Sequence, residues 1–376
     1  MKFQHCLVPV ALGVLCGCST LPSTGPTGSQ IRSTAEEAVE TGAGPQIAIV
    51  EVNRAEVVPP VLPPVQWALP MQPTTPTDIV GPGDVLAISI YEAGIPLFGS
   101  TGASAEIGGS FDPAVKMQAL PASRVNDDGE ITIPYVGRLN VMGRTVTEVQ
   151  EMIGQSLRTL SQDPQVLVNR EQVITNSVIV AGEVVQPGRL VLETNQESMS
   201  DVIALSGGYR GDPKDLVLRV KRGENEARIR LSKVMAGAYE DLKAYPGDRL
   251  TILPEPMMYS VMGASGRVQQ FAFTRDTMTV MEAIANAGGP DRSTADPQAV
   301  FLLRFTGPNG AEPVVYHFNL MKTPTYFLAQ QFALRDDDIL YFGNAEANQP
   351  RLLIQTISQL FAPVVTVTTV ANSLGN

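Results

Sequence analysis

The stretch SVIVAGEVVQPGRL, residues 177–190, decides the fold because its pattern returns later in the same chain. Hydrophobic residues run up to a glycine, a Gln-Pro-Gly turn follows, and the pattern is echoed by YSVMGASGRVQQF at residues 259–271. Short hydrophobic runs punctuated by Gly and Pro predict β-hairpins. Gly182 and Gly263 lie 81 residues apart, so the sequence predicts a tandem repeat.

The residues after each hairpin strengthen the repeat. MSDVIALSGGY at 199–209 is echoed by VMEAIANAGGP at 280–290, and YPGDRLTIL at 245–253 is echoed by RDDDILYF at 335–342. The Gly-Gly pairs predict helix C-caps, since the residue after a helix often needs a positive φ. Each copy therefore predicts a small α+β unit in which one helix lies on a curled sheet.

The residues before the repeats carry a different pattern. GPGDVLAISIYE at 81–92 predicts a strand, and residues 125–153 predict a turn, two strands and a helix capped by Thr145 or Thr147. Residues 18–77 have little regular pattern apart from a β-like stretch at 46–52, and they hold seven prolines between Pro59 and Pro76. We expect either a semi-extended tether that wraps as a strap or a plain disordered linker.

The N-terminus predicts a secreted lipoprotein. Lys2 precedes an apolar run at residues 6–15, which is too short to cross a bilayer. Leu15-Cys16-Gly17-Cys18 fits a bacterial lipobox, in which Cys18 receives a diacylglyceryl group; cleavage by the ordinary signal peptidase is the alternative. Ser19, in place of an Asp, favours the outer membrane.

The composition argues against nucleic-acid binding and catalysis. The net charge is −11 and the pI is near 4.8, so no basic surface is predicted. The sequence holds no P-loop and no G-x-S-x-G motif. Asn126-Asp-Asp-Gly129 predicts a turn rather than a calcium loop, Arg335-Asp-Asp-Asp338 predicts a solvated turn, and His317 is expected to be satisfied or exposed. We therefore expect no enzyme activity, no cofactor and no metal.

Three stretches, GPGDVLAISIYE, VNDDGEITIPYVGRLNVMGRTVTEVQ and VIVAGEVVQPG, resemble the Wza-type outer-membrane polysaccharide export lipoproteins. CSTLPSTGPTGSQI at 18–31 resembles the capsule-export branch of that family. The resemblance implies a multidomain α+β protein with a polysaccharide export domain, two soluble-ligand-binding β-grasp repeats and a C-terminal amphipathic membrane-spanning helix. The implied division is a signal peptide at 1–17, a lipidated Pro-rich linker at 18–77, the export domain at 78–175, the repeats at 176–256 and 257–345, and the helix at 346–376.

The C-terminal tail is compatible with that helix. After Arg351 it has no charged residue, and residues 351–373 would form a helix about 35 Å long, enough to cross a bilayer. At 100° per residue one arc is apolar and faces lipid in this interpretation: Leu353, Ile357, Leu360, Phe361, Val364 and Val365. The other arc would line a pore: Gln355, Ser358, Gln359, Thr366, Thr369 and Ser373. Pro363 would kink the segment. A helix packed on the protein's own domains, or a β-strand, remains open.

The resemblance implies a passive channel for capsular or extracellular polysaccharide. It would be a homo-oligomeric ring, often an octamer, with an α-helical barrel through the outer membrane and the bulk of the chain in the periplasm. An inner-membrane co-polymerase is the implied partner, belonging to an ATP-driven exporter or to a polymerase-and-flippase system, and residues 18–26 favour the ATP-driven kind. The alternative is a periplasmic scaffold or glycan-binding module that does not span the membrane.

Overall fold

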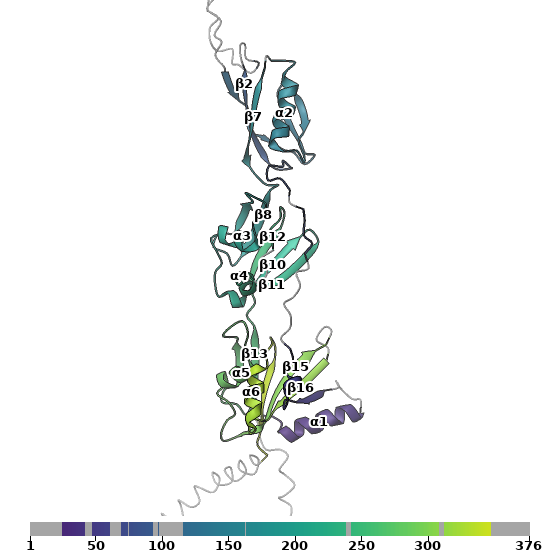
Figure 1. The fold of residues 1–376 in the computed structure, drawn as a ribbon, viewed down its shortest axis with the longest axis vertical. Helices are drawn as coiled ribbons and strands as arrows, with labels where there is room; N and C mark the ends of the chain where they lie inside the picture. The colour runs from purple at the N-terminus through teal and green to yellow at the C-terminus, as the bar shows by residue number, and fades with distance from the viewer. Residues whose placement is uncertain are drawn as a thin grey trace, which may run out of the picture. The chain divides into compact units, whose positions relative to one another are not determined.

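A computed structural model describes residues 25–41, 47–60, 69–73, 75–92, 97, 116–161, 163–237, 242–307 and 312–346. The chain divides into two compact units, one of Met1–Pro63 with Pro256–Asn376 and one of Pro64–Glu255 (Figure 1). The first unit thus joins an N-terminal segment to the second repeat. The other unit holds the export-domain residues and the first repeat.

The export-domain residues form a sheet around one central strand, β2 (Val85–Glu92). Its neighbours are β3 (Lys116–Ala119), β4 (Ser123–Arg124) and β7 (Gln165–Gln172). Every second residue of β2 is buried, and Leu86, Ile88 and Ile90 point into the core because side chains alternate along a strand. A hairpin of β5 (Glu130–Ile133) and β6 (Gly137–Asn140) follows.

The helix of this domain, α2 (Val146–Leu157), confirms one of the two predicted caps. The Thr145 side chain accepts from the backbone N–H of Glu148, and the Glu148 carboxylate accepts from the N–H of Thr145. This reciprocal pair satisfies two amides that a helix start leaves unpaired. Val149, Ile153 and Leu157 then form the buried face of the helix.

The two repeats have the same strand order, which explains the sequence echo. The first is β11-β10-β12-β8-β9 and the second is β16-β15-β17-β13-β14, with β1 added beside β16. The first repeat comprises β8 (Ser177–Gly182), β9 (Gly188–Val191), α3 (Met199–Leu205), η3 (Pro213–Asp215), β10 (Leu216–Arg222), β11 (Asn225–Arg230), α4 (Leu231–Met235) and β12 (Arg249–Pro254). The second comprises β13 (Met258–Gly263), β14 (Gln269–Ala272), α5 (Val280–Asn286), β15 (Ala295–Thr306), β16 (Glu312–Phe318), α6 (Thr323–Gln331) and β17 (Ile339–Asn344).

Glycine recurs at the same places in both repeats for two different physical reasons. The Gly-Gly pairs after α3 and α5 have positive φ angles of 80° and 87° and of 80° and 73°, as predicted for helix caps. Gly182 and Gly263 lie against the carbonyl oxygens of Ile252 and Phe342 on the parallel neighbouring strand, where a Cβ would overlap that oxygen. Only glycine permits the two backbones to approach this closely.

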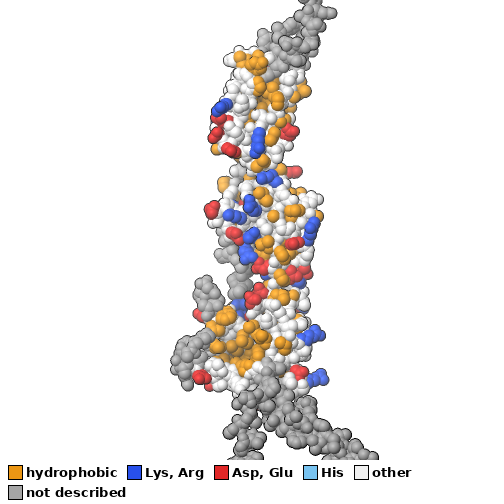
Figure 2. Space-filling model, turned by 180° about the vertical axis from the view of Figure 1, so that it is seen from behind, with side chains coloured by type: hydrophobic (Ala, Val, Ile, Leu, Met, Phe, Trp, Pro, Cys, Tyr) orange, Lys and Arg blue, Asp and Glu red, His pale blue; other side chains and the backbone are white. Residues whose placement is uncertain are grey.

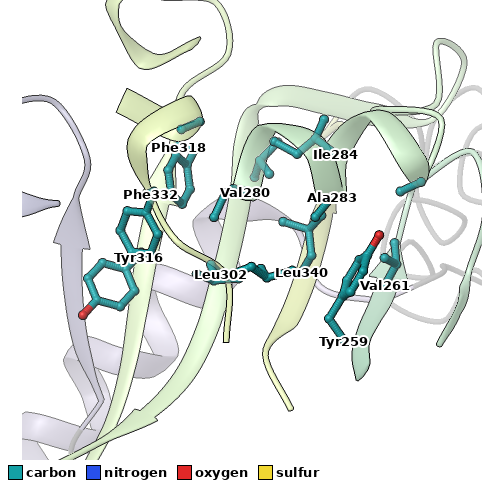
Figure 3. Close-up of a cluster of buried hydrophobic side chains, with 14 of the residues drawn as sticks. Tyr259, Val261, Val280, Ala283, Ile284, Leu302, Tyr316, Phe318, Phe332 and Leu340 are labelled. Atoms are coloured by element: carbon teal, nitrogen blue, oxygen red, sulfur yellow. The ribbon is translucent and has the colours of Figure 1, made fainter. Parts of the chain in front are cut away.

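The core of the second repeat lies between the sheet and its two helices. Figure 3 shows Val280, Ala283 and Ile284 of α5 directed at Leu302 and Leu340 of the sheet. Phe332 packs edge-on against both Tyr316 and Phe318, with ring centroids 4.9 and 5.4 Å apart. Such aromatic contacts add to the hydrophobic stabilisation of a core.

The other face of this sheet is covered only in part. Phe301 and Val315 are buried there under the N-terminal segment, whereas Phe305, on the same face of β15, is 70% exposed. Figure 2, which views the molecule from behind, shows hydrophobic side chains gathered over this domain.

The N-terminal segment differs from the predicted linker at 18–77. It contains a helix that was not predicted, α1 (Gly28–Thr41), then β1 (Ala48–Glu51) within the predicted β-like stretch, and η2 (Ala55–Val57). β1 pairs in parallel with β16, so residues 48–51 are part of the second repeat's sheet. Among the described residues, no helix combines the length and hydrophobicity that crossing a bilayer requires.

Candidate functional site at the chain ends of the second repeat

The residues that the sequence singled out for membrane contact lie outside the described part of the chain. These are Cys18 and the whole tail, with its predicted lipid-facing and pore-lining sets. The described residues do show where the positions next to these segments, Gly25 and Glu346, belong in the fold.

The first and last described residues lie at one end of one sheet. Thr27 and Asn344 form a parallel β-bridge, and the Asn344 side-chain amide donates to the carbonyl of Gly25 at 2.7 Å. The Tyr341 hydroxyl donates to the carbonyl of Pro26 at 2.8 Å, and burial raises the pKa of that hydroxyl. The first and last described segments are therefore neighbours in space, although more than 300 residues separate them in the sequence.

The helix α1 begins at this junction with a capping pair that the sequence contains. The Gln30 side chain accepts from the Thr27 backbone N–H at 2.9 Å, and the Thr27 hydroxyl accepts from the Gln30 N–H at 3.3 Å. Thr-x-x-Gln ahead of a helix is a known N-terminal signature, and it could have located α1 from the sequence. Gly28 then faces Ala299 of β15 so closely that a Cβ would stand 2.7 Å from the alanine Cβ.

His317 of β16 joins the N-terminal segment to the sheet. The side chain is 3% exposed; its Nδ1 lies 2.6 Å from Oε2 of Glu51 on β1, and its Nε2 lies 2.6 Å from the carbonyl of Gln298 on β15. One face of the ring stacks on Phe301, and Arg32 of α1 lies 3.2 Å from Nε2. The histidine is thus satisfied, which is one of the two outcomes that the sequence predicted, and it joins β16 to three other elements, β1, β15 and α1.

The prediction of a solvated turn at Arg335-Asp-Asp-Asp338 is confirmed for the turn but wrong for the exposure of Asp338. Residues 335–338 do form a turn, but Asp338 is buried and accepts from Arg304 through both carboxylate oxygens, at 2.8 and 2.6 Å. Its Oδ2 also accepts from the backbone N–H of Arg335 at 2.7 Å. A buried cation on the neighbouring strand draws this carboxylate inward, and nothing in the local sequence specifies that partner.

The same arrangement recurs in the first repeat and includes the N-terminal chain. Asp248 accepts from Nε and Nη2 of Arg222 at 2.8 and 2.7 Å, and the remaining Nη1 donates to the carbonyl of Pro70 at 2.7 Å. Leu69 is buried in that repeat's core, and Asn195 donates to the carbonyl of Thr75. Leu69, Pro70 and Thr75 therefore lie against the first repeat.

Among the residues that the structure describes, no group of three or more His, Cys, Asp or Glu side chains is placed to hold an ion. At Asn126 the side-chain oxygen accepts from the Glu130 N–H at 2.8 Å, which closes the predicted turn.

Comparison with known proteins agrees with this architecture. Residues 72–170 match the model of the family described as polysaccharide biosynthesis/export protein, and residues 258–342 match the SLBB domain. The first repeat has the same strand order as the matched second one.

Relatives that align with most or all of the chain are also named as polysaccharide export proteins. The chain is 30% identical to the capsule polysaccharide export protein BexD of Haemophilus influenzae over 96% of each chain. It is 28% identical to the capsule polysaccharide export outer membrane protein CtrA of Neisseria meningitidis serogroup A over 100% of this chain and 99% of the relative. A Vi polysaccharide export protein of Salmonella typhi, VexA/TviF, is 28% identical over 70% of this chain and 73% of its own. With an export domain, two β-grasp repeats in tandem and relatives that align from end to end, the chain belongs to the Wza-type polysaccharide export family.

Proposed function

We propose that this protein is a lipid-anchored outer-membrane channel that exports capsular or extracellular polysaccharide as a homo-oligomeric ring. The observation that supports this most is the contact between Gly25 and Asn344. Cys18 precedes Gly25 by seven residues, which span at most about 25 Å when fully extended. A lipid on Cys18 would thus hold the end of the second repeat close to a membrane, and the tail after Asn344 starts at that same end.

The names of the relatives support polysaccharide as the cargo and the outer membrane as the location. BexD, CtrA and VexA/TviF are all named for export of a capsule or Vi polysaccharide, and CtrA is named an outer membrane protein. By this analogy the bulk of the chain lies in the periplasm, with no enzymatic activity of its own, and meets an inner-membrane co-polymerase and exporter.

The tail provides the proposed route across the membrane. A single helix with Gln, Ser and Thr along one side would be costly in lipid, because polar groups lose their hydrogen bonds with water there. In a ring of such helices the polar arc, with Gln355, Gln359 and Thr366, would face a wet pore, and the apolar arc, with Leu353, Ile357 and Phe361, would face lipid. Ring closure needs a head-to-tail interface whose rotation closes.

Surface labelling of intact cells tests the proposal. An epitope tag after Asn376 is expected to bind antibody without permeabilisation. The matched control is the same tag inserted in the turn at Asp127, which should be silent until the outer membrane is opened. A C-terminal tag that is also silent on intact cells would favour a periplasmic scaffold that does not span the membrane. Loss of surface polysaccharide on deletion of residues 350–376, with the protein still stable, would complete the test.

A further inference from the structure

An exposed apolar patch lies on the second repeat, at the end of the sheet that carries the Thr27–Asn344 bridge. Met321, Tyr326 and Phe327 are 67%, 46% and 64% exposed, and we call them, with the exposed Lys322, the α6 patch. Three large hydrophobic side chains within seven residues are costly on a surface that meets only water. They therefore indicate a partner.

The sheet register places the α6 patch at the end of the sheet where Thr27 and Asn344 pair. Ala295 pairs with Asn344, and the N–H of Leu320 donates to the carbonyl of Pro297 two residues further along β15. Met321 therefore follows immediately at the end of the sheet that carries Asn344.

The helix α6 starts at the same end and directs its side chains back toward it. It runs from Thr323 to Gln331, and the Cα–Cβ bonds of a helix tilt toward its N-terminus. Tyr326 and Phe327 therefore lean toward Met321 and toward the end of the sheet that carries Asn344. Thr325 and Ala329, on the inner side of the helix, are buried.

The first repeat offers an internal comparison at one position. Its sequence IRLSK at 229–233 corresponds to FNLMK at 318–322, so Ser232 stands where the second repeat has Met321. Ser232 is part of α4, whereas Met321 lies in the turn that precedes α6, so the two copies differ at this point. The large exposed side chain of Met321 is therefore particular to the copy that contains Asn344.

We propose that the α6 patch inserts into the headgroup region of the lipid bilayer to which Cys18 is anchored. This rests on the proposed function, because the anchor supplies the membrane. Aromatic and aliphatic side chains beside a lysine suit the boundary between headgroups and acyl chains, where the lysine meets lipid phosphates. With both tethers at this end, the patch faces the bilayer at high local concentration.

A labelling experiment on the full-length lipidated protein tests this. After lipidation of Cys18 and loss of the leader the mature chain has no free thiol, so Phe327→Cys supplies a single site for an environment-sensitive fluorophore. Phe305→Cys is the matched control, since Phe305 has similar exposure in the same domain but lies beyond Leu303, which pairs with Ile339 at the opposite end of the sheet. Both proteins are reconstituted in phosphatidylethanolamine–phosphatidylglycerol vesicles, and quenchers are placed in the acyl chains or in water.

The expected result is strong quenching at 327 by lipid-borne quencher, with a depth of about 5–10 Å into the boundary, and little at 305. Equal quenching at the two positions would overturn the proposal. Protection at 327 from the aqueous quencher without lipid quenching would also overturn it and would identify a protein partner, such as a second copy.

Flotation separates this proposal from the proposed function. Protein that floats with the vesicles but shows no lipid quenching at 327 refutes the α6 contact and leaves the anchored channel intact. Protein that does not float refutes both. As a second variant, Met321→Ser with Phe327→Ser should lower the fraction of a Cys18→Ser protein that floats, whereas Phe305→Ser should not.

Discussion

Arg304 and Asp338 form a buried bidentate ion pair, and Arg222 and Asp248 form its counterpart in the first repeat. Each arginine also lies over an aromatic ring, Arg222 at 4.3 Å from the Tyr245 centroid and Arg304 at 5.2 Å from that of Phe332. The aspartate in each case closes the turn that leads into the parallel strand, by accepting from the N–H three residues before it. Asp84 closes the corresponding turn in the export domain through Gly81.

Breaking such a pair should destabilise its domain strongly. Asp338→Asn leaves the Arg304 charge buried without a counter-charge, and we expect a loss of about 3–5 kcal/mol in the free energy of unfolding. Urea titration followed by far-UV circular dichroism measures it. The control is Glu255→Gln, which removes the exposed pair with Arg228, and which should cost at most about 1 kcal/mol. Similar losses for both variants would contradict the assignment.

Asp337 should tolerate glycine with a gain in stability. Its φ is +63°, whereas the corresponding positions in the other two turns are Gly83 and Gly247 with φ of 90° and 86°. Because a left-handed conformation costs an L-residue roughly 1–2 kcal/mol, Asp337→Gly should raise the thermal midpoint of the second repeat. Asp336→Gly is the comparison, since the Asp336 carboxylate accepts from the Met258 N–H and its loss should lower the midpoint. A lower midpoint for Asp337→Gly would count against the strain.

Two glycines in regular structure should respond to alanine in opposite directions. Gly154 lies inside α2 with only a Val166 methyl near its missing Cβ, at 3.9 Å, so Gly154→Ala should stabilise by about 0.5–1 kcal/mol. Gly182→Ala would place its Cβ on the Ile252 carbonyl and should disrupt the pairing of β8 with β12. Chemical denaturation of the two variants side by side checks this, and stabilisation by Gly182→Ala would refute the close approach.

His317 should control how firmly the N-terminal segment binds. Removing the ring in His317→Ala breaks the contact with Glu51 and the stacking on Phe301. We expect faster amide hydrogen exchange in β1, measured by mass spectrometry, with β10 of the other unit as the unaffected reference. Glu51→Gln keeps a hydrogen-bonding group and should have a smaller effect. Unchanged exchange in β1 of His317→Ala would show that backbone pairing alone holds the strand.

The hydrogen bonds to the Asp291 carboxylate should make the stability of the second repeat depend on pH. Hydrogen bonds, first from the Ser293 hydroxyl and then from the Ser293 N–H and the Thr294 hydroxyl, lower the pKa of Asp291 from 3.8 to about 2. A lowered folded-state pKa contributes stability that is present above the unfolded value and disappears as the pH falls through the folded value. The midpoint difference between wild type and Asp291→Asn should therefore be constant above about pH 5 and shrink as the pH falls toward 2. A difference independent of pH, or a carboxyl that titrates near 3.8 by NMR, would contradict the contacts.

Much of the local structure could be predicted from short sequence patterns. The Gly-Gly caps, the Thr145 cap, the alternation in β2 and the turn at Asn126 all depend on residues within a few positions of one another. Such patterns can be recognised in the sequence because a helix start or a tight turn forms its hydrogen bonds between residues that are close in the chain. The order of the motifs also resembles that of the polysaccharide export family, and the whole-length relatives show that the chain belongs to it.

The contacts that define the candidate site could not be found in this way. Glu51 meets His317 across 266 residues, Asn344 meets Gly25 across 319, and Arg222 meets Pro70 across 152. Which residues make each of these contacts depends on which strand edge or buried charged group still lacks a partner once the domains have formed. The sequence by itself determined the repeats, their turns and the family. The tertiary structure alone decided that the N-terminal segment adds β1 to the last sheet and brings Gly25 and Thr27 beside Asn344, because unpaired strand edges and buried charges select their partners through space.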